Sequence, residues 1–206
     1  MYKKLLLRTF LLLLMFQVLF TPSLQAQEDP SPKRIVLLPV ITDANAGNDI
    51  TAFLAKALKK EVHIPLNLTL QAATYIPPEE IYQAMAALQI NEKTLYKKEN
   101  LQRLATALQA DIMAGFQVNN AYEYRFYSMT NDTFVLQSFV SLTLIYYDKN
   151  KNALQTFQDH DSFMDEFSLT GTLSALTEKT CDRLLKKAAI KKSLFPLSPS
   201  ARTENP

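Results

Sequence analysis

Apolar side chains fall at every second position over most of residues 134–146, and no other feature constrains the fold as strongly. They are Phe134, Leu136, Val140, Leu142, Leu144 and Tyr146, with only Ser138 interrupting the series. A period of two places all of them on one face of a β-strand. We therefore expect a strand with one buried face, while the opposite face, which carries Gln137, Ser141 and Thr143, is mixed.

Turn-like stretches lie on both sides of this strand. Residues 128–132 are SMTND and residues 148–152 are DKNKN, and both are rich in residues that favour turns. A third strand is expected to begin near Ala153. The second half of the chain is therefore predicted to be an antiparallel meander.

The strand before the first turn is expected to be long, extending over residues 113–127. Its apolar and charged residues alternate: Val118, Tyr122, Tyr124 and Phe126 share one parity, and Glu123 and Arg125 share the other. Alternation of this kind predicts two faces of different character.

The first half of the chain predicts alternating strands and helices. A buried strand is expected at Lys33–Val40, followed by a helix that Asp49 caps and that carries Ile50, Leu54 and Leu58 on one face. The remaining expected elements are a strand at Leu66–Gln71, a helix that starts at Pro77 and Pro78, a helix at Lys97–Gln109, a strand at Asp111–Val118 and a final helix at Thr170–Ala189. The predicted fold class is α/β (α+β), a mixed sheet with a βαβ first half, a three-stranded antiparallel meander and helices packed on the sheet.

The N-terminal 26 residues have the pattern of a secretory signal peptide. Lys3, Lys4 and Arg8 precede an apolar run over Thr9–Phe20, and Ala26 suits a cleavage site. An apolar run of this length is too short for a stable transmembrane helix, although an uncleaved anchor is the alternative. Cys181 is the only cysteine, so lipid attachment after the run is not expected. The mature protein is expected to be exported to the periplasm or beyond, with no stable membrane span.

The rest of the chain divides into three parts. Residues 27–32 are expected to be a short linker, residues 33–195 a single α/β domain, and residues 196–206 a disordered tail rich in Pro and Ser. Three positive and no negative charges lie in the signal segment, so the formal net charge of +2 becomes about −1 without it. A near-neutral domain gives no electrostatic basis for binding nucleic acid.

No catalytic or cofactor motif appears in the sequence. The three glycines are Gly47, Gly115 and Gly171, which are too few and too dispersed for a P-loop, a dinucleotide fingerprint or a nucleophile elbow. We therefore expect no cofactor and no nucleotide-dependent activity.

The combination that most resembles a catalytic or metal site is Asp159, His160 and Asp161. In a strand the two carboxylates would share a face and His160 would point away, so the three would not converge on one proton or metal ion. A solvated strand end is the interpretation that we favour. His63 is the only other histidine, and its position after a helix end indicates a structural role, so no metal site is expected.

Two further features concern Cys181 and a cluster of aromatic residues. Cys181 lies on the apolar side of the last predicted helix, where a thiol behaves as a small buried hydrophobic group. The aromatic cluster comprises Tyr122, Tyr124, Phe126 and Tyr127. Core packing is its ordinary explanation, but tyrosines near a strand end also form interfaces, and we treat these four residues as a possible interface.

Three segments resemble a group of bacterial envelope proteins, that of the TolB N-terminal domain and the CsgG-type curli secretion proteins. They are KRIVLLPV at 33–40, LQRLATALQADIMAGFQV at 101–118 and SLTLIYYDKNKNAL at 141–154. The chain departs from the group in having Val40 where an aromatic residue is common and in lacking a lipidation cysteine. The resemblance implies an α/β scaffold that binds or assembles other envelope components.

The leading hypothesis is a non-enzymatic, extracytoplasmic binding or assembly module of the bacterial envelope. Its expected partners are envelope proteins or cell-wall components. One alternative is a subunit of a larger envelope or secretion complex, a homo-oligomer that pairs through edge strands. Another is a small secreted hydrolase that uses Asp159, His160 or Asp161.

Overall fold

A mixed six-stranded sheet organises the part of the chain that the computed structural model describes, residues 32–42, 47–62, 73–130, 132–166 and 168–190. The strands are β1 (Lys33–Leu37), β2 (Ile41–Thr42), β3 (Ala73–Tyr75), β4 (Ile112–Ser128), β5 (Thr133–Asp148) and β6 (Ala153–Glu166). The main path is β3-β1-β4-β5-β6, and β2 pairs with β4 beside it. Parallel pairs join β1 to β3 and β4, and antiparallel pairs join β4, β5 and β6. The predicted fold class is confirmed.

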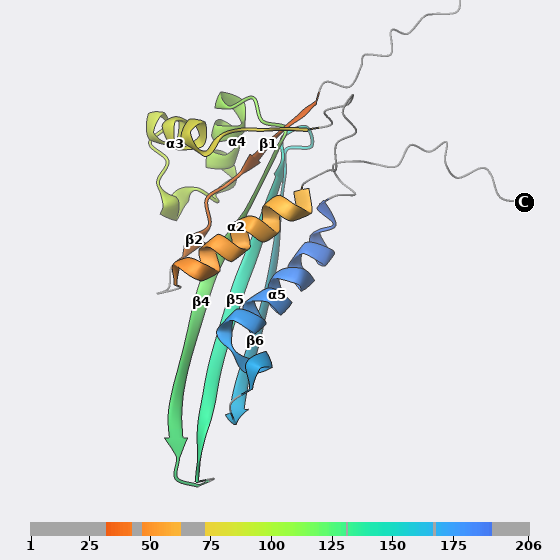
Figure 1. Ribbon diagram of the computed structural model, residues 1–206. Helices are drawn as coiled ribbons and strands as arrows, with labels where there is room; N and C mark the ends of the chain where they lie inside the picture. Colours follow the sequence, from red (N-terminus) through yellow and green to blue (C-terminus); the bar gives the residue numbers. More distant parts are fainter. Residues whose placement is uncertain (1–31, 43–46, 63–72, 131, 167, 191–206) are drawn as a thin grey trace, which may run out of the picture. The chain divides into compact units, whose positions relative to one another are not determined.

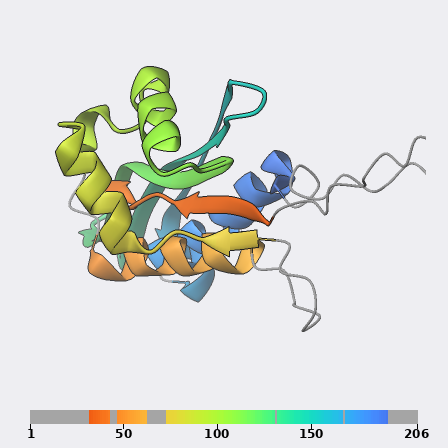
Figure 2. The same ribbon diagram turned by 90° about the horizontal axis from the view of Figure 1, so that it is seen from above.

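Helices cover both faces of this sheet. They are α2 (Asn48–Val62), α3 (Pro78–Ala87), α4 (Lys98–Ala107) and α5 (Leu173–Ala188), with short 3-10 turns at Glu92–Thr94 and Leu169–Gly171. Helices α2 and α5 lie on one face, and α4 lies on the other (Figures 1 and 2). Two apolar clusters result, one beneath α2 and α5 and one beneath α3 and α4. Among the described residues, no helix has the length and apolar character needed to cross a bilayer.

The start of α3 follows the predicted signal, while α2, α4 and α5 start within a few residues of the predicted positions. Pro77 and Pro78 begin α3, and Glu79 and Glu80 occupy its first turn, where carboxylates oppose the positive end of the helix dipole. Helix α2 begins at Asn48, so Asp49 lies in the first turn and is not the capping residue that the sequence predicted. Helix α4 begins one residue after the predicted Lys97.

Two helices end with glutamine in the left-handed conformation that glycine usually adopts. Gln89 after α3 has φ 56° and Gln109 after α4 has φ 51°. In both cases the next amide reaches back five residues, from Ile90 to the carbonyl of Met85 at 2.9 Å and from Ala110 to that of Ala105 at 2.9 Å. This closing pattern satisfies carbonyls that the helix leaves free.

Four predicted segments fall wholly or mainly outside the described residues. They are the signal segment 1–26, the tail 196–206 and the strand at Leu66–Gln71; the linker 27–32 is described only at Pro32. His63 also lies outside them. The described strand in that region is β3, which begins at Ala73 and pairs with β1 in parallel, so β1, α2 and β3 form the expected βαβ unit.

The pattern that predicted β5 holds along most of the strand. Leu136, Val140, Leu142, Leu144 and Tyr146 are buried on the face beneath α5, and Ser138 is buried with them. Phe134 is the exception, because 65% of its surface is exposed. It lies next to the hairpin turn, where the strand has passed the cover of the helices (Figure 1).

A β-bulge corrects the predicted faces of β4. The register with β5 shifts between Val118 and Asn120. Val118 therefore faces the core beneath α2 and α5, and Ala121 follows it on that face, while Tyr122 points to the opposite side. Val118 and Tyr122 share a parity in the sequence but not a face in the fold.

Candidate binding surface on the long strands

The three long strands have one face that the described helices leave largely open. On the inner face α5 packs along β5 and β6. On the other face, the apolar cluster beneath α3 and α4 ends at Met113 of β4 and at Ile145 and Tyr147 of β5. Beyond these residues toward the hairpin tip, we call this side of the strands the outer face.

An aromatic ladder crosses the outer face, and it consists of Phe126, Tyr124, Tyr122, Phe139 and His160. Successive ring centroids lie 6.0, 5.8, 5.6 and 6.2 Å apart in that order. The rings come from β4, β5 and β6, which the cross-strand register brings side by side. The ladder therefore spans all three strands.

Exposure distinguishes these rings from a core. Tyr122 is 37% exposed and Tyr124 is 48% exposed, and the Tyr124 hydroxyl donates to Gln137 Oε1 at 2.6 Å. Met164 extends the surface on β6 opposite Gln137 and is 67% exposed. Core packing, the ordinary explanation for the tyrosines, does not describe Tyr122 or Tyr124.

The outer face carries almost no charge. The register and the alternation of side chains place Ser141 and Thr143 of β5 and Gln158, Ser162 and Met164 of β6 beside the ladder. Glu166 at the end of β6 is the charged residue of this face within the described strands. The inner face of the same strands bears Glu123, Arg125, Asp159, Asp161 and Asp165. Aromatic, methionine-bearing and charge-depleted surface is typical of the centre of a protein interface.

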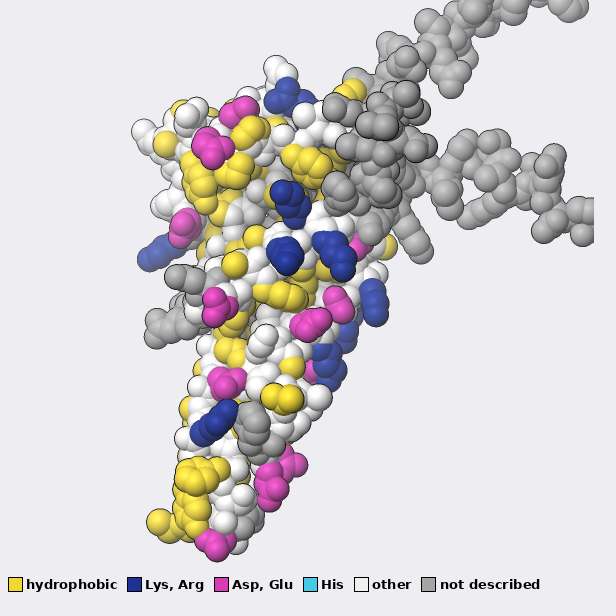
Figure 3. Space-filling model, viewed as in Figure 1, with side chains coloured by type: hydrophobic (Ala, Val, Ile, Leu, Met, Phe, Trp, Pro, Cys, Tyr) yellow, Lys and Arg dark blue, Asp and Glu magenta, His cyan; other side chains and the backbone are white. Residues whose placement is uncertain are grey.

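Tyr127 does not join the other three predicted interface residues. The bulge and the register place it on the inner side of the hairpin tip, where its ring meets Phe134 edge-on at a centroid distance of 5.3 Å. Its hydroxyl donates to the carboxylate of Asp132. Hydrophobic side chains, including the 91% exposed Met129, gather at this tip (Figure 3).

Sequence reasoning missed Phe139, His160 and Met164 as members of this surface. Phe139 belongs to the face of β5 whose side chains are mixed in polarity, and the two aspartates beside His160 draw attention away from its face of the strand. The alternation of Gln158, His160, Ser162 and Met164 against Asp159, Asp161 and Asp165 was a usable signal. It separates an uncharged face of β6 from an acidic one.

Asp159, His160 and Asp161 are arranged as their alternation predicted. Both carboxylates point toward α5, and His160 points to the outer face beside Phe139. The trio lies in the middle of β6 with the carboxylates partly buried and ion-paired, which corrects the expected solvated strand end. The three side chains share no proton, so this arrangement gives no support to a hydrolase.

Arg183 of α5 binds both carboxylates. Its Nε lies 2.8 Å from Asp159 Oδ2 and its Nη1 lies 3.0 Å from Asp161 Oδ2. Lys187 and Lys179 add one ion pair each, to Asp159 at 3.3 Å and to Asp161 at 3.0 Å. Hydrogen bonding to Arg183 lowers the pKa of Asp159. Burial opposes ionisation of Asp161, but bonds from Arg183 and Lys179 outweigh it and lower its pKa too. The cluster fastens α5 to β6.

Replacing Arg183 with glutamine is expected to lower the free energy of unfolding by about 1–2 kcal/mol at neutral pH, allowing for the partial exposure of the guanidinium. A depressed carboxyl pKa stabilises the fold above the ordinary value of about 4, and this contribution is lost as the pH falls through the lower folded-state pKa. Urea unfolding of wild type and Arg183→Gln should therefore differ less at about pH 3 than at pH 7. Lys151→Gln removes a pair whose lysine is 69% exposed, and it should change stability little. An equal loss for Arg183→Gln at both pH values would contradict the assignment.

Cys181 is fully buried, as its position on the apolar side of the helix predicted. Burial, with the nearby charges of Asp182 and Glu178, raises the pKa of its thiol to about 12. A thiol of this kind is not a nucleophile near neutral pH. Within the described residues, no group of three or more histidine, cysteine, aspartate and glutamate side chains is placed to hold a metal ion.

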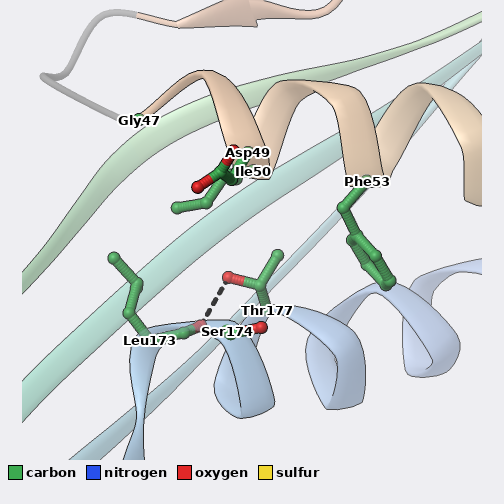
Figure 4. Close-up of a pocket in the computed structure, with 7 residues that line it drawn as sticks. All are labelled: Gly47, Asp49, Ile50, Phe53, Leu173, Ser174 and Thr177. Carbon is green, nitrogen blue, oxygen red and sulfur yellow. Dashed lines mark hydrogen bonds between the residues drawn. The ribbon is translucent and has the colours of Figure 1, made fainter.

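A hollow of about 250 Å³ separates the start of α2 from the start of α5 (Figure 4). Asp49, Ile50 and Phe53 reach it from α2, and the Thr177 hydroxyl beside it donates to the carbonyl of Leu173 at 2.7 Å. Asp49 is the one ionisable side chain among the seven residues that line it. Nucleophilic catalysis needs a nucleophile and a base in contact, and this lining does not provide them.

Comparison with known proteins yields similar folds but no family. No protein-family model matches the chain, and no curated protein matches it. Similar solved structures include lipoprotein GNA1162 from Neisseria meningitidis, with 12% identity over 77% of this chain and 99% of that chain and a TM-score of 0.45. The LpoB C-terminal domain from Salmonella enterica has 11% identity over 65% of this chain and 86% of that chain, with a TM-score of 0.39.

A third similar structure is the PelC dodecamer from Paraburkholderia phytofirmans. It has 12% identity over 74% of this chain and 84% of that chain, with a TM-score of 0.36. All three structures come from bacteria, but TM-scores this low leave the function to be argued from the geometry. The resemblance to the TolB and CsgG group stays a prediction.

Proposed function

We propose that this chain is a non-enzymatic binding and assembly module of the bacterial cell envelope, and that the outer face of β4, β5 and β6 docks a protein partner. The observation that carries the proposal is the exposed aromatic ladder within an almost uncharged surface. Water leaves such a surface at little electrostatic cost, because few charges lose their hydration. The export signal expected at residues 1–26 supports an extracytoplasmic location.

The contrast between the two faces of the strands also supports docking. The inner face carries Glu123, whose carboxylate accepts from the amide of Leu173 at 2.6 Å, and the Arg183 cluster. These charged groups bind α5 to the inner face, so α5 already covers that face. The outer face of the same strands has no described helix above its ladder. Large exposed apolar and aromatic patches on otherwise polar domains commonly mark interaction sites.

Photo-cross-linking in living cells tests the proposal. A photoreactive amino acid at Tyr124, which is 48% exposed on the outer face, is expected to give a discrete cross-linked protein. The same probe at Tyr82, which is 54% exposed on α3, is the matched control and should not give that product. Equal products from both positions, or no product from Tyr124, would contradict docking on the outer face.

A subunit of a larger complex is the second candidate, and the edge strand β6 favours it. Strand β6 has 14 residues and pairs with β5 on one side only within the described sheet. A long edge presents backbone groups that a second copy can pair with. Light scattering of the purified protein tests this alternative, since pairing along β6 raises the molar mass with concentration and a constant monomer mass excludes it.

A further inference from the structure

A cavity of about 360 Å³ lies between α2 and α3, away from the outer face. Its lining comes from three places: the segment that continues β1 toward β2, the middle of α2 and the start of α3. Leu37 and Val40 line it from the first, Leu58 and Lys59 from the second, and Ile81 and Tyr82 from the third. Small-ligand sites in proteins have volumes of roughly 300–1,000 Å³, so this cavity is at the lower end of that range.

The short edge strand β3 explains why the cavity exists. Pairing of β3 with β1 ends at Ile35 and Tyr75, and the Ile76 amide makes one more bond to the Ile35 carbonyl at 3.0 Å. The chain then turns into α3 at Pro78. Residues 37–40 therefore run on past β3 at the edge of the sheet, with α2 and α3 on either side. The carboxyl ends of parallel strands are a common location for ligands in open α/β sheets.

The inner part of the cavity is lined by apolar side chains. Leu58 and Ile81 are 1% and 2% exposed, and Leu37 and Val40 of the β1–β2 connection are half-buried beside them. Tyr82 and Pro78 lie at the exposed rim. This combination gives an apolar interior with a partly aromatic entrance, which suits an alkyl chain.

Positive charge lies at the entrance. Lys56 and Lys59 are exposed residues three positions apart on α2, so they lie on neighbouring parts of one helix face. No carboxylate lines the cavity, and neither lysine forms an ion pair with any described residue. Basic side chains lie over α2 next to hydrophobic side chains in the surface view (Figure 3), and the basic residues of α2 are all lysines. An anion between the two ammonium groups would relieve their mutual repulsion.

Two other hollows of the described structure do not combine these features. A hollow near the 3-10 turn at Glu92–Thr94 is lined by Glu92 together with Lys93 and Lys97, so its charges already offset one another. The hollow of Figure 4 carries Asp49 and no cation. The cavity between α2 and α3 alone among these three has an apolar interior and an unopposed positive rim.

We propose that this cavity binds a single-chain anionic amphiphile, with its alkyl chain against Leu58 and Ile81 and its head group between Lys56 and Lys59. A volume of about 360 Å³ admits one short alkyl chain and not the two chains of a membrane phospholipid. A free fatty acid carboxylate and the phosphate of a one-chain lipid share this chemistry. The site is independent of the docking surface, because it lies on other elements.

Calorimetric titration of the purified protein with decanoate, and separately with decyl phosphate, tests the proposal and distinguishes the two head groups. One equivalent of either amphiphile is expected to bind, and the ratio of the two dissociation constants distinguishes the head groups. Neutral decanol should bind more weakly, and acetate, which lacks the chain, should not bind. The double variant Lys56→Gln, Lys59→Gln should weaken binding about five- to tenfold, as expected for two exposed charge contacts.

A bulky residue at Ala55 tests the location. Ala55→Trp places an indole at the exposed rim and is expected to weaken binding at least tenfold. Ala52→Trp is the matched control, since Ala52 is exposed on the same helix and does not line the cavity. Lys60→Gln is the matched charge control. Circular dichroism and thermal unfolding establish that each variant is folded. Absence of binding by both amphiphiles, or binding that Ala55→Trp and the lysine double variant leave unchanged, would overturn the proposal.

Discussion

Replacing Gly115 with alanine is expected to lower the free energy of unfolding by about 2–4 kcal/mol, because the added methyl group has no space. A Cβ at this position would lie 2.6 Å from the Tyr96 hydroxyl and 2.9 Å from Leu38 Cβ. The Tyr96 hydroxyl is itself fixed, at 2.8 Å from the Pro39 carbonyl and 2.9 Å from the Phe116 carbonyl. Moving it would cost hydrogen bonding as well as packing.

Urea unfolding measures this effect, and Gly47→Ala is its control. A Cβ at Gly47 would have no neighbour within 4 Å, so alanine there should not destabilise the protein by crowding. Tyr96→Phe removes the nearest atom, and in the double variant with Gly115→Ala the combined loss should be smaller than the sum of the single losses. Strict additivity, or a loss at Gly115 no larger than at Gly47, would contradict the packing explanation.

The double variant Tyr122→Lys, Tyr124→Lys is expected to abolish docking on the outer face. Aromatic residues at the centre of an interface commonly contribute about 2 kcal/mol or more each, so losing both should weaken binding by at least about 100-fold. Two lysines also place desolvated positive charge in an otherwise uncharged surface. Both tyrosines are exposed, so the fold should tolerate the change.

Oxidation of Met164 by hydroxyl radicals in living cells is the readout for this variant. Met164 lies on the outer face, and a bound partner would shield it. In the double variant its oxidation should rise to the level seen in the purified protein. Tyr127→Lys is the matched control, since Tyr127 is also 48% exposed but lies on the inner side of the hairpin tip. An equal effect of Tyr127→Lys would point to the tip as the docking site.

The periodicity of the sequence predicted much of the fold because it reflects local geometry. The buried face of β5, the start of α3 at the two prolines and the buried side of α5 with Cys181 all follow from spacing along one element. The opposed directions of His160 and its two aspartate neighbours follow in the same way. These features need no knowledge of what lies on the next strand.

Which residues of β4 face the core could not be predicted beyond Val118, because one extra residue at the bulge reverses the alternation. The bulge between Val118 and Asn120 exchanges the two faces for the rest of the strand. It places Tyr122 and Tyr124 outside the core. Tyr127 lies on the inner side because it has the opposite parity to those two residues. A bulge depends on pairing with β5, which alternation along β4 alone does not contain.

Burial near the hairpin tip and membership of the ladder depend on tertiary structure. Phe134 continues the apolar parity of β5 but extends beyond the cover of the helices, and helix length and docking angle set that limit. Phe139 and His160 become neighbours through the β5–β6 register, where Phe139 is opposite Ser162 and Ser141 is opposite His160. No short-range pattern in the sequence predicts that register. The aromatic ladder therefore could not be predicted from any single strand.

Oxidation of Met164 relative to Met129 in the wild-type protein tests the central claim most directly. Both are exposed methionines, with 67% and 91% of their surface accessible, but Met164 lies on the outer face and Met129 at the hairpin tip. If the outer face docks a partner, oxidation of Met164 should fall severalfold in cells relative to the purified protein, while that of Met129 stays unchanged. Equal oxidation of Met164 in cells and in the purified protein would contradict a docked outer face.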